Sequence, residues 1–118
     1  MDFHVKVNKV EFDEAQAVYR YYMSGKAADV VIEIPKAFKK LDVGSEGKIS
    51  LLRSEKPGAE CKNGFLLCGR VLSIQNENKK AILSFGGLMV LITLKDGVFS
   101  DLSEDSSVCI CVTEFNVW

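Results

Sequence analysis

The sequence predicts a single all-β domain over residues 1–118, folded as one eight-stranded antiparallel barrel. Along most of the chain, apolar and polar residues alternate with a period of two, which is typical of strands that bury one face. Turn-forming residues separate about eight short runs of β-forming residues, and no long stretch has a helical period. Glycines interrupt several runs, as expected in a curved sheet, and barrel closure removes exposed sheet edges.

The N-terminal half is expected to contain strands at residues 3–7, 17–23, 29–34 and 48–54. In the first strand, the alternation slips by one residue at Asn8-Lys9, which indicates a β-bulge or the end of the strand. Pro35 closes the third strand, because proline lacks the N–H that a sheet needs. Residues 36–41 are expected to form a helical turn or a loop.

The C-terminal half is expected to contain strands at residues 65–75, 80–85, 88–94 and 107–115. Gly69 indicates a bend within the first of these, and residues 76–78 predict a hairpin turn. Gly86 and Gly87 lie within the most apolar stretch of the chain, although glycine costs stability inside a strand. The pair therefore indicates a tight bend, a close backbone contact, or a surface that contacts another molecule.

Charge and hydropathy narrow the classes of function. Fifteen basic and sixteen acidic residues give a net charge of −1, whereas proteins that bind nucleic acid mainly through phosphates usually have a basic excess. The uncharged run at residues 81–94 is shorter than the ~20 residues of a membrane-spanning helix, and the N-terminus does not resemble a signal peptide. We therefore expect a soluble cytoplasmic protein that does not bind membranes.

Four cysteines allow disulfides or a zinc site in principle. Neither Cys61 and Cys68 nor Cys109 and Cys111 have the Cys-x2-Cys spacing, and the single histidine, His4, is far away in sequence. The last two would lie on one face of a strand, about 6.6 Å apart. They could share a ligand only if a second pair folded over them. We favour small hydrophobic core residues in a reducing compartment, with no metal site.

The sequence contains no combination of residues typical of an enzyme active site. His4 is expected on the exposed side of a strand, and general base catalysis needs a partner within hydrogen-bond distance. Nucleophile and phosphate-binding motifs are absent. Asp101, Glu104 and Asp105 lack the regular spacing of a calcium loop, so a solvated acidic loop is expected. We predict no catalytic residues and no cofactor.

One candidate binding surface combines aromatic and basic residues. Its members are Tyr19, Arg20, Tyr21, Lys36, Lys39 and Lys40. Aromatic rings flanked by cations stack single-stranded bases on the faces of some barrels. However, Tyr19 and Tyr21 share one face of the predicted strand and Tyr22 lies on the other, as core packing would require. We favour core and rim packing for these tyrosines.

A second candidate binding surface surrounds the paired glycines. Its members are Phe85, Gly86, Gly87, Leu88 and Met89. Both faces of this strand are apolar, so neither is evidently intended for water. One face fills the barrel, and the other needs cover from the same chain or from a partner. The residues alone leave these two options open.

Three segments of the chain resemble one protein family. They are residues 64–74 with the sequence Gly69-Arg70-Val71, residues 82–91 with an aromatic-Gly-Gly-Leu junction at 85–88, and residues 108–115. In these segments, the chain resembles the eighth subunit of eukaryotic nuclear RNA polymerases and the archaeal RNA polymerase subunit that corresponds to it. Weaker similarity covers residues 29–34 and 42–52. The chain lacks the long insertions of the eukaryotic form, which favours the archaeal one.

The resemblance implies an eight-stranded barrel related to oligonucleotide-binding folds. It also implies a non-catalytic subunit of DNA-directed RNA polymerase, docked on the largest subunit of a multi-subunit complex in the cytoplasm, or in the nucleus if the source is eukaryotic. Gly86 and Gly87 would allow close backbone approach, with Phe85, Leu88 and Met89 as contacts, and no sequence-specific nucleic-acid binding is expected. The alternatives are a free-standing single-stranded nucleic-acid-binding barrel, and a small-ligand or zinc protein built on the cysteines.

Overall fold

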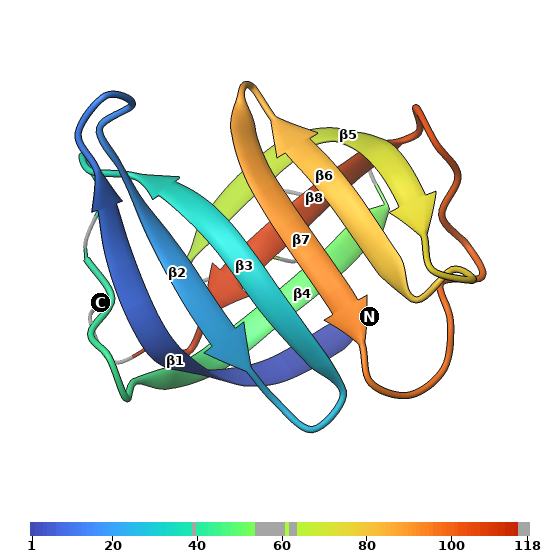
Figure 1. Ribbon diagram of the computed structural model, residues 1–118, viewed down its shortest axis with the longest axis horizontal. Helices are drawn as coiled ribbons and strands as arrows, with labels where there is room; N and C mark the ends of the chain where they lie inside the picture. The colour runs from blue at the N-terminus through green and yellow to red at the C-terminus, as the bar shows by residue number, and fades with distance from the viewer. Residues whose placement is uncertain (39, 54–60, 62–63, 116–118) are drawn as a thin grey trace.

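Eight antiparallel strands form a closed β-barrel in the computed structural model (Figure 1), as the sequence predicts. The structure describes residues 1–38, 40–53, 61 and 64–115. The strands are β1 (Asp2–Asp13), β2 (Val18–Ser24), β3 (Ala28–Pro35), β4 (Glu46–Arg53), β5 (Phe65–Gln75), β6 (Lys80–Phe85), β7 (Leu88–Leu94) and β8 (Ser107–Thr113). They follow the order β1-β2-β3-β7-β6-β5-β8-β4 around the barrel. The described part of the chain contains no candidate for a membrane-spanning helix.

Side chains from all eight strands fill the interior of the barrel. The predicted alternation places Phe3, Val5 and Val7 of β1 inside, while the residues between them face solvent. Longer-range packing completes the core, since Leu41 and Phe99 are buried although both lie in loops. Burying an aliphatic or aromatic side chain of this size stabilises a fold by roughly 1.5–3 kcal/mol. The interior is therefore filled by the chain's own residues.

Two strands contain irregularities where the barrel curves. The β1–β2 register shifts between Val7 and Lys9, which confirms the slip predicted there. In β5, the shift lies between Val71 and Ser73, beyond the bend expected at Gly69. Gly69 instead allows a close approach of two strands, because a Cβ atom there would lie 2.0 Å from the carbonyl oxygen of Ser84 on β6. The bulge therefore curves β5, and Gly69 allows β6 to approach it closely.

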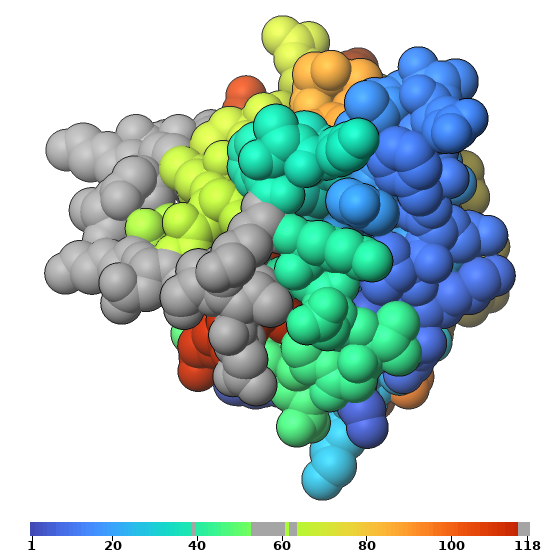
Figure 2. Space-filling view, turned by 90° about the vertical axis from the view of Figure 1, so that its left-hand side faces the viewer, coloured from blue at the N-terminus to red at the C-terminus, as the bar shows by residue number. Residues whose placement is uncertain are grey.

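The loop between β3 and β4 covers one end of the barrel. Figure 2 shows this segment, coloured teal to green, on the surface beside β1 in blue. It begins as a turn, in which the Phe38 N–H donates to the Pro35 carbonyl oxygen at 3.0 Å. The buried Tyr21 hydroxyl accepts a hydrogen bond of 3.0 Å from the Leu41 N–H. This bond fixes the loop to the interior.

The last strand is shorter than the sequence suggested. The prediction extends it to Phe115, whereas β8 ends at Thr113 and Glu114 has a positive φ of 67°. The chain therefore turns before Phe115, whose ring is buried. A Cβ atom on Gly47 would lie only 2.3 Å from that ring, so this glycine makes room for it. The apolar residue belongs to the core but not to the strand.

Candidate functional site

Gly86 and Gly87 form a two-residue turn between β6 and β7. Phe85 pairs with Leu88 across this turn, and the two glycines have φ angles of 62° and 95°. Positive φ at both central positions defines a type I′ turn, whose twist matches that of an antiparallel hairpin. Residues with a side chain rarely adopt such angles, and glycine does so without strain. The structure confirms the bend among the three roles indicated for the glycine pair.

At the tip of this hairpin, the space into which a side chain would project from either glycine is open. A Cβ atom built on Gly86 or Gly87 would meet no heavy atom of the described chain within 4 Å. Close approach between neighbouring strands therefore does not explain either glycine. Their lack of side chains leaves room at the tip for another molecule.

The three apolar residues next to the glycines lie in different surroundings. Phe85 points into the core with only 5% of its surface exposed, and Leu88 is half-buried against the core. Met89 is half-buried and alternates with the fully buried Val90, so it lies on the outer face of β7. Of the residues predicted as partner contacts, Met89 lies on the outer face of β7, whereas Phe85 is buried in the core.

An apolar stripe crosses the outer face of three neighbouring strands. Leu91 of β7 pairs with Val31 of β3 on one side and with Ile82 of β6 on the other. All three are half-buried and alternate with buried core residues, as does Met89. Directly opposed side chains in a sheet lie about 5 Å apart at Cβ, so the row is continuous. We call Val31, Ile82, Met89 and Leu91 the outer apolar stripe.

A buried carboxylate joins the start of β7 to β3. The β3–β7 ladder ends at the pair Ile32–Val90, and beyond it the two strands diverge (Figure 1). There the Met89 N–H donates to Oε1 of Glu33 at 2.9 Å. The other carboxylate oxygen accepts hydrogen bonds from Nη2 and Nε of Arg20, at 2.6 and 3.2 Å. The Glu33 side chain thus links β3 to β7 beyond the end of their backbone ladder. This role was not predicted from the sequence.

Arg20 is consequently held in place by acidic partners. Its guanidinium also lies 3.7 Å from Asp13, and the hydrogen bond to Glu33 raises the pKa of Arg20 above its ordinary value. On the adjacent outer surface, the Tyr22 hydroxyl donates to Glu11 at 2.5 Å. This bond lowers the pKa of Glu11 and raises that of Tyr22. The positive charge predicted for a nucleic-acid surface is largely neutralised at Arg20.

The predicted aromatic and basic surface is only partly assembled. Tyr21 is completely buried, and burial raises the pKa of its hydroxyl, which confirms the core packing favoured for it. Tyr19 is half-buried at the rim, where the ammonium group of Lys40 lies 5.3 Å from its ring centroid. Lys39 lies outside the described residues. Tyr21 is therefore not accessible for base stacking, whereas Tyr19 and Lys40 lie together at the rim.

Phe12 completes this rim cluster and was not among the predicted residues. Its side chain is 44% exposed, and its ring centroid lies 5.2 Å from that of Tyr19. The Lys36 ammonium group lies 5.6 Å from the centroid of the Phe12 ring. Because Phe12 pairs with Tyr19 across β1 and β2, a hairpin prediction would have brought the two rings together. We call Phe12, Tyr19, Lys36 and Lys40 the rim cluster.

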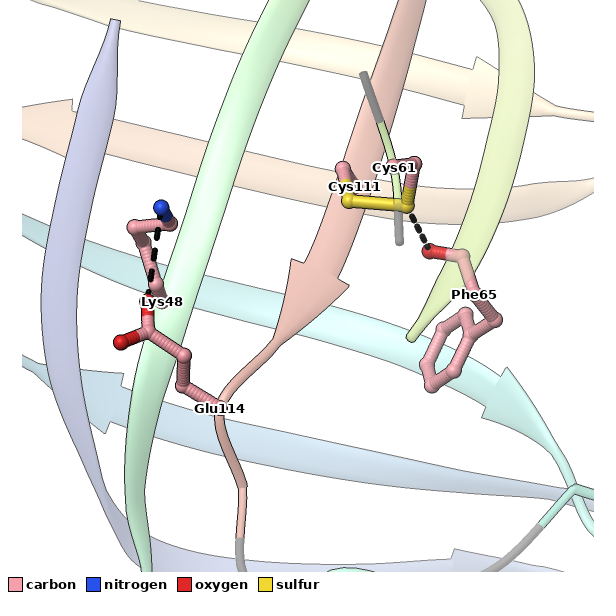
Figure 3. The surroundings of a disulfide bond; sticks show 5 residues. All are labelled: Lys48, Cys61, Phe65, Cys111 and Glu114. Atoms are coloured by element: carbon pink, nitrogen blue, oxygen red, sulfur yellow. Dashed lines mark hydrogen bonds and ion pairs between the residues drawn. A yellow bond between two sulfur atoms is a disulfide. The ribbon is translucent and has the colours of Figure 1, made fainter. Parts of the chain in front are cut away.

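The cysteines differ from the favoured prediction, because they are not independent hydrophobic residues. Cys61 forms a disulfide with Cys111, and Cys68 forms one with Cys109 (Figure 3 shows the first). Cys109 and Cys111 are buried, as expected of core cysteines, but their side chains belong to the outer face of β8. The pairing depends on β5 lying beside β8, which no local sequence pattern reveals.

His4 and the predicted acidic loop lie on the surface of the barrel. His4 is exposed on β1, as predicted, along a groove of about 630 Å³. The groove contains both acidic and basic side chains, including Asp2, Lys6 and Glu46, which gives no preference for either sign of ligand charge. In the acidic loop, Glu104 accepts a hydrogen bond from the Ile74 N–H at 3.2 Å. With both disulfides formed, no described cluster of His, Cys, Asp and Glu is arranged to hold a metal ion.

Neither models of protein families nor curated proteins match this chain.

Proposed function

We propose that this chain is a non-catalytic structural subunit of DNA-directed RNA polymerase, docked on the largest subunit of the complex in the cytoplasm. The observation that carries the proposal is the outer apolar stripe. The core of the barrel is filled without these four side chains, which lie half-buried together on its outer face. Apolar residues gathered on an outer face typically mark a protein–protein contact.

Two further features support this proposal. The resemblance to the polymerase subunit family implies an oligonucleotide-binding-like barrel, and a closed eight-stranded barrel is compatible with that expectation. The open type I′ turn lies at the end of the same hairpin that carries Met89, so stripe and tip form one continuous edge for a partner. Fold alone would not establish the function, because small barrels serve many purposes.

Leu91→Lys should weaken association with the largest subunit by about 30-fold or more, because a central interface residue contributes about 2 kcal/mol or more. The measurement is the amount of largest subunit that co-purifies with the tagged chain expressed in its native cells. Val43→Lys is the matched control, since Val43 is 62% exposed on the loop between β3 and β4, away from the stripe. Its recovery should equal that of the wild type.

The variant Gly86→Asn tests whether the hairpin tip contacts the partner, independently of the stripe. Asparagine tolerates positive φ and is favoured at the first position of a type I′ turn, so this variant adds a side chain without breaking the turn. Reduced recovery would place the tip within the contact. Equal recovery of Leu91→Lys and Val43→Lys would refute docking through the stripe. Failure of the wild-type chain to recover polymerase subunits would refute the proposed complex.

The rim cluster favours a second candidate function, the binding of single-stranded nucleic acid. Two aromatic rings in contact and two ammonium groups are gathered at one end of the barrel. A base that stacks on Phe12 must displace Lys36 from the ring. Exposed cation–π contacts contribute about 0.5–1 kcal/mol and base stacking about 1–3 kcal/mol, so the exchange is favourable. The displaced ammonium group would then be able to pair with a phosphate.

Phe12→Ala should reduce oligonucleotide affinity by roughly 5- to 150-fold, the equivalent of one stacked base. Fluorescence anisotropy with a labelled single-stranded oligonucleotide at low salt provides the measurement. Val98→Ala is a control, since Val98 is exposed outside the cluster. Lys36→Ala should also reduce the dependence of affinity on salt, because fewer counterions are released. The absence of wild-type binding at low salt would exclude this second function.

A further inference from the structure

We infer that, once its disulfides are reduced, this chain binds one zinc ion through the thiolates of Cys61, Cys68, Cys109 and Cys111. The inference does not depend on the polymerase proposal. It follows from the way the fold gathers all four cysteines of the sequence at one place on the barrel. It departs from the expectation that the chain has no metal site.

The last strand supplies two of the ligands. In β8, Cys109 and Cys111 alternate with Val108, Ile110 and Val112, all three of which are fully buried core residues. The two cysteines therefore share the outer face of the strand, separated by about 6.6 Å along it. Two ligands on one face are insufficient for a structural zinc site, which normally has four.

A second pair of cysteines folds over the first. Cys68 lies directly opposite Cys109 in the β5–β8 ladder, with a Cα–Cα distance of 4.0 Å. Cys61 comes from the segment before β5, and its Cα atom lies 5.6 Å from that of Cys111. The condition that the sequence left open, a second pair folded over Cys109 and Cys111, is therefore met.

These separations suit a shared zinc ion. A thiolate binds zinc at about 2.3 Å, and the cysteine side chain adds about 2.8 Å between Cα and Sγ, so the Cα atoms of two ligands lie at most about 10 Å apart. The distances of 4.0 and 5.6 Å lie within this limit. The separation of about 6.6 Å along β8 does so as well. Each of these three cysteine pairs is therefore close enough to share a zinc ion.

Oxidation state decides which of the two arrangements forms. A disulfide sulfur is not a thiolate, so the four sulfur atoms become zinc ligands only after both bonds are reduced. Two molecules of a small thiol reduce one disulfide and become a disulfide themselves, transferring two electrons and two protons. Reduction of both bonds yields four thiols, which release up to four protons when zinc binds.

The surroundings of Cys68 and Cys61 favour reduction of the two disulfides. Cys68 is exposed, whereas Cys109 is only 1% exposed, so this disulfide reaches the surface on its β5 side. The Cys61 Sγ atom lies 3.5 Å from the carbonyl oxygen of Phe65 (Figure 3), a contact that becomes an S–H···O hydrogen bond only in the thiol form. Four thiolates in a tetrahedral arrangement select zinc or an iron–sulfur centre, and zinc needs no further inorganic component.

The test uses the full chain, reduced with an excess of dithiol under nitrogen, supplied with zinc sulfate, and desalted. Elemental analysis should find about one zinc per reduced chain and almost none on the oxidised chain. Replacing zinc by cobalt(II) should give the visible absorption bands of a tetrahedral thiolate site. Zinc should also raise the unfolding midpoint of the reduced chain, because it binds the folded state.

Cys109→Ser should lower zinc affinity by roughly 100-fold or more and change the cobalt spectrum, whereas Ser107→Ala on the same strand should do neither. If Cys109→Ser fails to fold, wild-type stoichiometry and the cobalt spectrum still decide the question. The inference is overturned if the reduced wild type retains no zinc, or if the oxidised chain retains as much.

Discussion

Reduction of both disulfides in the presence of a chelator should lower the free energy of unfolding by about 6.5 kcal/mol. The two bonds close long stretches of chain, with sequence separations of 50 and 41 residues. Chain-entropy estimates give about 4 kcal/mol for either bond alone. Folded domains are stable by only about 5–15 kcal/mol in total, so the reduced, metal-free barrel should be marginal. Denaturant titrations with and without reductant measure the difference.

The two disulfides should not contribute additively, because one loop lies inside the other. Once Cys68–Cys109 is closed, the outer bond Cys61–Cys111 restricts only a further loop of about ten residues. Removing either bond alone by paired alanine substitutions should therefore cost about 2.5 kcal/mol, less than half the cost of removing both. Additive losses would show that local packing, rather than restriction of the unfolded chain, determines the stabilisation.

Glu33→Ala should destabilise the barrel by about 2–3 kcal/mol. It removes the acceptor of the Met89 N–H and leaves Arg20 without its buried partner. Breaking a fully buried ion pair costs about 3–5 kcal/mol, but the Arg20 side chain is 30% exposed and retains Asp13 at 3.7 Å, which reduces the loss. The destabilisation should be greatest near Met89, where β7 diverges from β3.

Two measurements distinguish this anchor from general destabilisation. Denaturant unfolding should give the loss for Glu33→Ala, a smaller loss for Glu33→Gln, and almost none for Glu46→Ala, since Glu46 lies at the start of β4 and is not buried. Hydrogen exchange at the Met89 amide should accelerate in Glu33→Ala more than at Ile92 in the same strand. Uniform acceleration along β7 would contradict a local anchoring role for Glu33.

The strands could be predicted because the residue patterns that specify them involve only neighbouring positions. Alternation from Phe3 to Val7 identified the buried face of β1, and the slip at Asn8 located its bulge. The glycine pair marked the turn between β6 and β7, because positive φ is expensive for other residues. In each case, a few adjacent residues were sufficient to determine the local backbone structure.

The parts of the candidate sites that could not be predicted depend on neighbours that are distant in sequence. Cys68 meets Cys109 only because β8 inserts beside β5, and Glu33 meets the Met89 amide only where two strands separate. The position of Glu33 within an apolar strand resembles that of any solvent-facing charge. Phe12 was likewise missed because its partner, Tyr19, had to be found across a hairpin.

The place of β8 also has a consequence for how the chain folds as it leaves the ribosome. β8 is the last of the described strands along the sequence, yet it lies between β4 and β5. Until residues 107–113 emerge, β4 and β5 each present an unpaired edge to other nascent chains. Closure must then join segments made early and late, and such long-range pairing is slow. The chain therefore depends on its final strand both to complete the barrel and to escape aggregation during synthesis.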